Sequence, residues 1–196
     1  MAKRVCVLFS GNMGAGKDTA ANMLADVCRE RGVSSFRIAF ADPIKDIAAS
    51  LLGVPKEVSY GTQQDKLDYI VYGKTVRHWH QWIGTEMGRQ QVHTDVWVHR
   101  FAERALASDA SVVIGVDCRF LNEMMTTGEL LSGKMDLYFV RIVNPRVPLN
   151  LEHQSESEVH AMNDSLFHYV IHNTKGLDYL RSNIENFADG VLNRIS

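Results

Sequence analysis

The sequence predicts an α/β fold in which a central parallel sheet carries helices on both faces. Three observations lead to this class. Continuous apolar runs, rather than alternating ones, occur at 4–9, 111–116 and 136–143, which is typical of strands buried on both faces. Segments with a helical spacing of apolar residues separate these runs, and this alternation indicates parallel strands joined by helical crossovers. A glycine-rich loop lies between the first strand and the first helix.

In the first part of the chain, apolar spacing, glycine and proline define the elements. The first helix covers 17–31, because its apolar residues recur at helical spacing and Gly32 follows at the position of a C-terminal stop. A strand is expected at 35–40. The next helix begins at 42, where proline fits the first turn, and it ends at Gly53.

The middle of the chain has less regular patterning. The stretch 54–73 is polar and has no clean period, so we expect a mobile insertion there. A helix is predicted at 76–91 with an interruption at Gly84, and another at 95–107, capped by Thr94 or Asp95.

The last part of the chain returns to buried strands. The strand at 111–116 ends at Asp117, a further strand covers 136–143, and a shorter one covers 167–171. A final helix is expected at 177–195, and Ser155 with Glu158 forms a capping-box pattern for a helix start before it.

Length, charge and cysteine content narrow the class of protein. The chain has 196 residues, 45% of them hydrophobic, which suits a single domain over 1–196 with a full-sized core. A net charge of -2 gives no general attraction to a nucleic acid polymer or to a membrane surface. No apolar run is long enough for a membrane span or a signal peptide. Cys6, Cys28 and Cys118 look like reduced core residues, so we expect a cytoplasmic protein.

The segment Gly11-Asn12-Met13-Gly14-Ala15-Gly16-Lys17 fits the pattern G-x-x-x-x-G-K. In this loop the backbone N–H groups face phosphate oxygens at the positive end of a helix, and the lysine adds a full charge. The apolar strand before it and the amphipathic helix after it are the context that the motif requires. The fold prediction is therefore a three-layer P-loop fold that binds a nucleotide phosphate chain.

Candidate metal and phosphate ligands lie near this loop. The position after the lysine, normally Ser or Thr, is Asp18, and the hydroxyl follows as Thr19. Asp18 either lies close to Mg²⁺ or is an acidic first-turn residue of the helix; Thr19 is either a hydroxyl ligand or an ordinary helix residue. Asp117 ends a strand at the edge where parallel sheets bind ligands, and Arg119 brings a guanidinium there.

Several P-loop classes fit poorly. The guanine-reading string N-K-x-D is absent, and the nearest segment, 173–176, lacks both its order and its Asp. Motor and transport ATPases usually need an arginine from a partner, whereas this chain has its own. A small kinase fits better, and a phosphate acceptor needs no catalytic base because its second pKa is about 6.

The sequence resembles the phage-type deoxynucleoside monophosphate kinases. The matching strings occur in the order of that family and are Gly16-Lys17-Asp18-Thr19, Pro43-Ile44-Lys45-Asp46, Val76-Arg77 with Gln81 and Gly84-Thr85-Glu86, Asp117-Cys118-Arg119 with Glu123, and His153-Gln154-Ser155-Glu156. The resemblance implies ATP-dependent phosphorylation of a deoxynucleoside 5′-monophosphate to the diphosphate, with ATP and Mg²⁺ as cofactors. It also implies a monophosphate-binding insertion at 54–94 and a lid region at 141–160.

The resemblance and the motifs together assign the expected site residues. Catalysis is assigned to Lys17, Arg119 and Asp117, and Mg²⁺ to Asp18, Thr19 and Asp117. The donor nucleotide is assigned to Gly11, Asn12, Gly14, Ala15, Gly16, Lys17, Asp18 and Thr19, with Arg141 and Arg146 from a loop that is either a lid or only a connection. The monophosphate is assigned to Lys45, Arg77, Glu86 and Arg119, with Trp82 as a surface on which a base could stack.

Two other functions stay open from the sequence alone. One is another small-metabolite kinase that shares G-K-D, such as a phosphomevalonate-type enzyme, and the other is a nucleotide-dependent switch protein without enzymatic activity. The accepted bases, the preference for deoxyribose over ribose, the role of 153–156 and the formation of a homodimer are not determined by the sequence.

Overall fold

The chain divides into two structural units. The computed structural model describes residues 4–148, 154–193 and 195. The first unit comprises 1–39 and 101–196, and the second comprises 40–100. The predicted insertion at 54–94 lies wholly within the second unit. The predicted lid at 141–160 lies in the first unit, and its residues 149–153 fall outside the described part of the chain.

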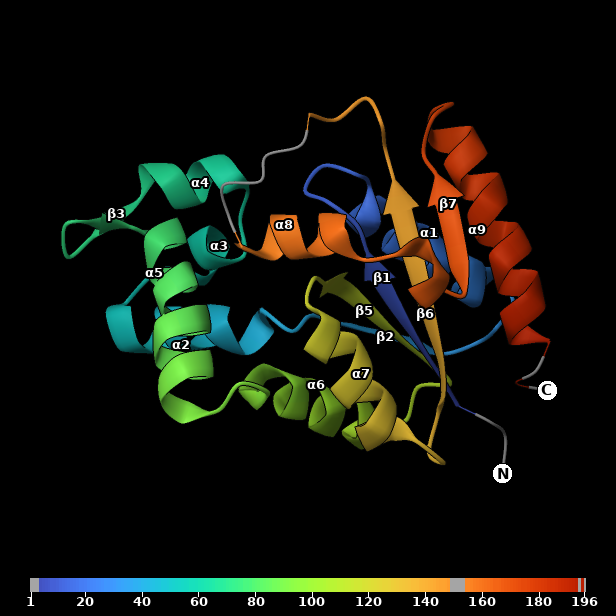
Figure 1. Cartoon of the computed structure of the whole chain (residues 1–196), viewed down its shortest axis with the longest axis horizontal. Helices are drawn as coiled ribbons and strands as arrows, with labels where there is room; N and C mark the ends of the chain where they lie inside the picture. The colour runs from blue at the N-terminus through green and yellow to red at the C-terminus, as the bar shows by residue number, and fades with distance from the viewer. Residues whose placement is uncertain (1–3, 149–153, 194, 196) are drawn as a thin grey trace. The chain divides into compact units, whose positions relative to one another are not determined.

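A five-stranded parallel sheet forms the centre of the first unit (Figure 1). The strand order is β2-β5-β1-β6-β7, and every adjacent pair is parallel. The strands are β1 (Val5–Ser10), β2 (Ser35–Ile38), β5 (Val112–Cys118), β6 (Asp136–Val143) and β7 (Tyr169–His172). All six residues of β1 are buried, as its continuous apolar run predicts.

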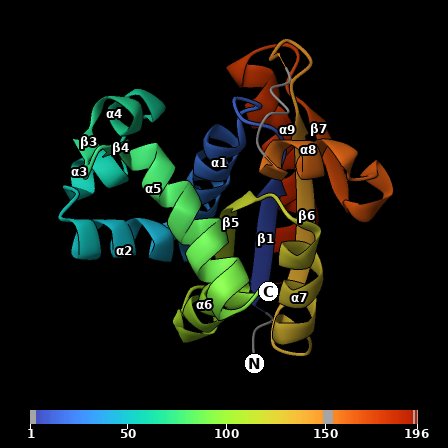
Figure 2. The same cartoon turned by 60° about the vertical axis from the view of Figure 1, so that its left-hand side comes forward.

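Helices cover both faces of this sheet, which confirms the predicted fold class. Helices α1 (Lys17–Glu30) and α9 (Leu177–Leu192) lie on one face, and α7 (Leu121–Leu131) lies on the other (Figure 2). Val5, Val7 and Phe9 of β1 share a buried cluster with apolar residues of α1 and α9. The alternate residues of β1 face the other layer, as a period of two requires. Two shorter helices, α8 (Gln154–Ala161) and η2 (Asp164–Leu166), precede β7.

Most predicted elements of the first unit are present, with small differences in extent. Strand β5 runs on to Cys118, so Asp117 lies inside the strand rather than after it. Strand β7 begins two residues later than predicted, because Phe167 caps the short helix η2. Helix α7 was not predicted from the sequence; its Thr126, Thr127 and Gly128 weaken the helical pattern. Cys6, Cys28 and Cys118 are buried free thiols, as expected.

The second unit is built from short helices and one hairpin. Its elements are α2 (Asp42–Leu52), α3 (Lys56–Ser59), α4 (Gln63–Asp68), β3 (Ile70–Val71), β4 (Lys74–Thr75), α5 (Val76–Trp82) and the π-helix η1 (Ile83–Val92), and α6 (Val96–Ala107) crosses from this unit into the first. Ala48, Ile83 and Trp97 form its small buried cluster. Gly53 ends α2 with a φ of 68°, as predicted.

The interruption predicted at Gly84 takes the form of a change in helix type. The chain continues from α5 into a π-helix instead of breaking. The indole N–H of Trp97 donates a hydrogen bond to the Gly84 carbonyl at 2.8 Å. A Cβ on Gly88 would lie 2.3 Å from the Trp97 ring, so glycine is required for the ring to pack there. Such π-helical segments are frequent at functional sites.

Within the described part of the chain, no helix is both long and apolar enough to cross a lipid bilayer.

We predict that Gly11 and Gly32 differ sharply in their tolerance of alanine. Both have positive φ angles, of 141° and 68°. A Cβ on Gly11 would lie 2.3 Å from the Ile142 carbonyl oxygen, whereas a Cβ on Gly32 meets nothing within 4 Å. Gly11→Ala should therefore lower the free energy of unfolding by about 2–4 kcal/mol and Gly32→Ala by about 1 kcal/mol, measured by urea denaturation. Equal losses would contradict the close packing of the loop against β6.

Candidate functional site

Three glycines give the loop between β1 and α1 its shape. Gly11, Gly14 and Gly16 have φ angles of 141°, 78° and 105°, a region that other residues rarely adopt. The side-chain amide of Asn173 donates a hydrogen bond to the Ala15 carbonyl at 3.1 Å, and a Cβ on Gly16 would lie 2.7 Å from the nitrogen of that amide. The loop is therefore folded tightly against the ends of the neighbouring strands.

Lys17 begins α1, and its side chain turns back into the loop. Its ammonium donates hydrogen bonds to the carbonyls of Gly11, at 2.6 Å, and Asn12, at 2.8 Å. The residue is only 6% exposed. Burial, and to a lesser extent the positive charge of Arg119, together lower the pKa of Lys17 to about 8, although nearby carboxylates oppose the shift. The loop thus holds a buried ammonium whose charged form would be stabilised by an additional negative charge, such as that of a phosphate.

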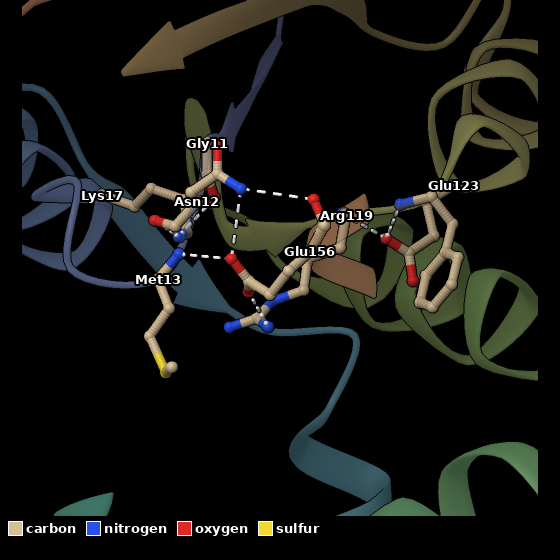
Figure 3. Close-up of polar contacts among 8 residues, drawn as sticks. Gly11, Asn12, Met13, Lys17, Arg119, Glu123 and Glu156 are labelled. Atoms are coloured by element: carbon tan, nitrogen blue, oxygen red, sulfur yellow. Dashed lines mark hydrogen bonds and ion pairs between the residues drawn. The ribbon is translucent and has the colours of Figure 1, made fainter. Parts of the chain in front are cut away.

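A buried carboxylate lies against the same loop (Figure 3). Glu156 of α8 is 4% exposed. Its Oε2 atom accepts hydrogen bonds from the backbone N–H of Met13, at 2.8 Å, and from the Asn12 side chain, at 3.3 Å. Its Oε1 atom is 2.8 Å from a guanidinium nitrogen of Arg119. Through Glu156, the Arg119 side chain is held at the mouth of the loop.

A second glutamate fixes the turn that carries Arg119. The Oε2 atom of Glu123, in the first turn of α7, accepts hydrogen bonds from the backbone N–H groups of Arg119, at 2.6 Å, and Phe120, at 3.0 Å. Glu123 is 2% exposed. The chain therefore turns sharply after β5, and the turn is held by a buried, charge-assisted bond.

The three residues predicted to bind magnesium occupy different environments. Asp117 is half-buried at the end of β5, and its charge raises the pKa of Lys17, so it lies close to the loop. The Asp18 side chain is 79% exposed and lies 3.4 Å from Arg37. Thr19 is half-buried in the first turn of α1. Among the described residues, no three His, Cys, Asp or Glu side chains cluster as a metal site.

This donor set fits magnesium. Mg²⁺ prefers hard oxygen ligands, keeps several waters, and is usually held by one or two carboxylates together with substrate phosphates. Asp117 and Thr19 offer a carboxylate and a hydroxyl near the loop, and Asp18 would have to leave Arg37 to join them.

A cavity of about 670 Å³ adjoins the loop in the first unit. Asn12 and Ala15 of the loop line it, together with the segment after β6 and residues near the end of α8. A volume of this size suits a small-molecule ligand. The cavity therefore offers space for a small molecule next to the loop.

The two arginines predicted to reach the donor nucleotide have partners within the protein. Arg141 is buried, and its guanidinium donates to the carbonyls of Met162, at 2.6 Å, and Val159, at 3.1 Å, and pairs with Asp164 at 2.8 Å. These bonds make it a support for the segment after α8 in this structure. Arg146 is exposed and donates to the Thr174 carbonyl, which links the loops after β6 and β7.

The residues predicted to bind the monophosphate, apart from Arg119, lie in the second unit. Lys45 is 3.5 Å from Asp42, and its ammonium is 4.7 Å above the centre of the Tyr60 ring. Arg77 is half-buried in α5. Trp82 is 38% exposed, and Glu86 is exposed on the π-helix.

Sequence reasoning missed part of the site. In the sequence, Glu156 and Glu123 stand out only as parts of the motifs shared with the phage-type kinases. Asn173 stands out only as part of the segment 173–176, which does not match the guanine-binding motif N-K-x-D. The roles of Glu156 and Asn173 depend on contacts between residues far apart in the chain: 144 positions separate Asn12 from Glu156, and 158 separate Ala15 from Asn173. His153 lies outside the described residues.

The sheet, the loop and its lysine give the chain the fold of the P-loop kinases. Solved structures share this fold. The APS kinase of Mycobacterium tuberculosis, in complex with AMPPNP and APS, superposes with a TM-score of 0.55 at 12% identity, covering 96% of this chain and 99% of that one. Shikimate kinase from Acinetobacter baumannii, in complex with shikimate, gives 0.52 at 15%, covering 98% and 95%.

A curated relative points to a narrower group. The deoxynucleoside-5′-monophosphate kinase of Escherichia phage T5 is 24% identical over 242 aligned positions, which cover 94% of this chain and 96% of that protein. The predicted resemblance to the phage-type kinases is thereby confirmed. No protein-family model matches the chain.

We predict that donor affinity weakens above neutral pH because of Lys17. Its pKa of about 8 means that the free ammonium loses its proton as the pH rises through that value. A phosphate ligand needs the charged form, so the dissociation constant for MgATP should rise between pH 7 and pH 9. The rise over this range should be about tenfold in total, and above pH 8 the slope should approach about tenfold per pH unit, because one proton is linked to binding. Calorimetry, with circular dichroism to confirm an unchanged fold, measures this; a constant affinity would contradict the contact.

Proposed function

We propose that this chain transfers the γ-phosphoryl group of MgATP to a deoxynucleoside 5′-monophosphate. The observation that carries the proposal is the glycine loop with the buried Lys17 ammonium inside it and the Arg119 guanidinium at its mouth. Two cations beside a glycine loop suit a reaction that moves a phosphoryl group. The choice of acceptor is supported by the likeness to the phage T5 kinase.

The donor is assigned to the first unit. Backbone N–H groups of 12–19 surround its phosphates, and Lys17 contacts the β- and γ-phosphates. The adjoining cavity receives the nucleoside. Arg146, on the exposed loop after β6, is kept as a contact to the donor, whereas Arg141 is assigned the task of supporting the cavity wall.

The chemistry asks little of an acid or base in the protein. An oxygen of the acceptor phosphate attacks the γ-phosphorus, and the bond from that phosphorus to the β-phosphate oxygen breaks. The acceptor phosphate is already ionised at neutral pH, since its second pKa is about 6. Lys17 and Arg119 therefore act by positioning and by neutralising charge. Magnesium, held by Asp117 and Thr19 with Asp18 nearby, would neutralise further phosphate charge when bound.

The proposed contacts to the monophosphate in the second unit are Lys45, Arg77, Trp82 and Glu86. Lys45 and Arg77 offer positive charge for its phosphate, and the exposed Trp82 ring offers a surface for its base. Glu86 is supported by its place on a π-helix, because such segments are frequent at functional sites.

We predict that Lys17→Ala loses at least about 10²-fold in turnover and keeps its fold, because one preorganised charge contact to the transferred group is removed. The measurement is a coupled assay of ADP release with each natural deoxy- and ribonucleoside monophosphate as acceptor. As a control, Lys134→Ala removes an exposed lysine of the same unit, and the turnover of this variant should equal that of the wild type.

The same assay separates the other functions. Turnover with deoxynucleoside monophosphates that depends on Lys17 supports the proposal. ADP release only with a different phosphorylated metabolite would indicate the phosphomevalonate-type alternative. Binding of MgATP without transfer to any acceptor would indicate a nucleotide-dependent switch protein and would refute the proposed activity.

A further inference from the structure

A carboxylate already occupies part of the proposed phosphate site. The Glu156 side chain accepts hydrogen bonds from the Met13 N–H, at 2.8 Å, and from the Asn12 side chain, at 3.3 Å (Figure 3). Both donors belong to the loop proposed to bind the phosphates of ATP. N–H groups of such a loop bind anionic oxygens. A negatively charged oxygen of the protein thus lies where an oxygen of the donor is expected.

The surroundings of Glu156 explain why an anion is needed there. Lys17 is buried, and Arg119 lies close enough to lower its pKa, so two positive charges repel one another in a poorly solvated place. Glu156 bonds to Arg119 at 2.8 Å, and its charge raises the pKa of Lys17. Two neighbouring cations with no counter-charge would destabilise the loop, because burial penalises unpaired charges. The glutamate supplies the largest of the negative charges that act on Lys17, with smaller contributions from Asp18 and Asp117.

We infer that Glu156 is a placeholder for the donor phosphate: it neutralises the cations in the nucleotide-free protein and gives up its bonds to the loop when the donor binds. This inference rests on the proposed function, since the incoming ligand is the phosphate chain of ATP. After binding, the charge of Glu156 repels the phosphates. The wild-type chain therefore binds ATP more weakly than it would without the charge of Glu156. In return, Glu156 holds the two cations in place before ATP binds.

A purely structural role for Glu156 predicts the opposite result. If its bonds only attach α8 to the loop, removing the carboxylate loosens the loop and weakens donor binding. If the carboxylate is a placeholder, removing its charge strengthens donor binding. The sign of the change in affinity therefore separates the two roles.

The decisive variant is Glu156→Gln, which keeps the size of the side chain and an oxygen that can accept the Met13 N–H. We expect its dissociation constant for MgATP, measured by calorimetry, to fall at least about fivefold, since one like charge is removed beside the phosphates. The KM for ATP should fall in parallel, without an equal rise in kcat. Glu156→Asp keeps the charge and should restore an affinity close to that of the wild type.

A matched control removes the same charge elsewhere. Glu129 is exposed on α7 of the same unit, and Glu129→Gln should leave the affinity for MgATP unchanged. This variant separates the local charge at the loop from the net charge of the protein.

The outcomes distinguish the inference from the function on which it rests. If the wild type binds MgATP and Glu156→Gln binds it equally or more weakly, the inference alone is wrong. If neither binds MgATP, the proposed function fails and the inference fails with it. Should Glu156→Gln not fold, the carboxylate carbon signal of Glu156 in the wild type provides the test by nuclear magnetic resonance. That signal should shift on saturation with MgATP, and an unchanged signal would overturn the inference.

Discussion

The candidate site of the first unit depends on one buried ammonium, that of Lys17, which is bonded to two backbone carbonyls of the glycine loop. Lys17 can reach the Gly11 and Asn12 carbonyls because the glycines allow the chain to turn back on itself at the end of β1. Burial of the charge is costly, as the lowered pKa of Lys17 shows. The loop tolerates this cost through carboxylates brought by other elements: Asp117 on β5 and Glu156 on α8. The parallel sheet brings these distant segments together at one of its edges.

Much of this fold could be predicted because it follows from local patterns in the sequence. Continuous apolar runs gave the strands β1, β5 and β6, since strands buried on both faces need no polar residues. Glycine and proline marked the limits of α1 and α2. Helix α7 was not predicted, because Thr126, Thr127 and Gly128 weaken its helical pattern and its N-cap residue is Phe120 rather than the Ser or Thr that marks a capping box in a sequence. The π-helix η1 likewise depends on Trp97, which packs against Gly88 from another helix.

The same distinction between local patterns and distant contacts applies to the candidate site. The loop and Lys17 follow from a motif in which neighbouring residues do the work, and Asp117 and Arg119 follow from their place at the end of a strand. Glu156 and Asn173 could not be assigned roles in advance, because their partners in the loop lie more than 140 positions away. Arg141 shows the reverse difficulty: its charge suggested a ligand contact, whereas its guanidinium is bonded to carbonyls of its own unit. A charged side chain reveals its chemistry in the sequence, but its partner only in three dimensions.

The central claim is that the N–H groups of 12–19 converge on the phosphates of a nucleotide. The most direct measurement follows the backbone amide signals of the nitrogen-15-labelled chain by nuclear magnetic resonance during titration with the magnesium complex of a non-hydrolysable ATP analogue. The account predicts that the largest shifts fall on loop amides, with smaller ones at residues lining the adjoining cavity. Saturation of the protein with the analogue while the loop amides stay unshifted would contradict it.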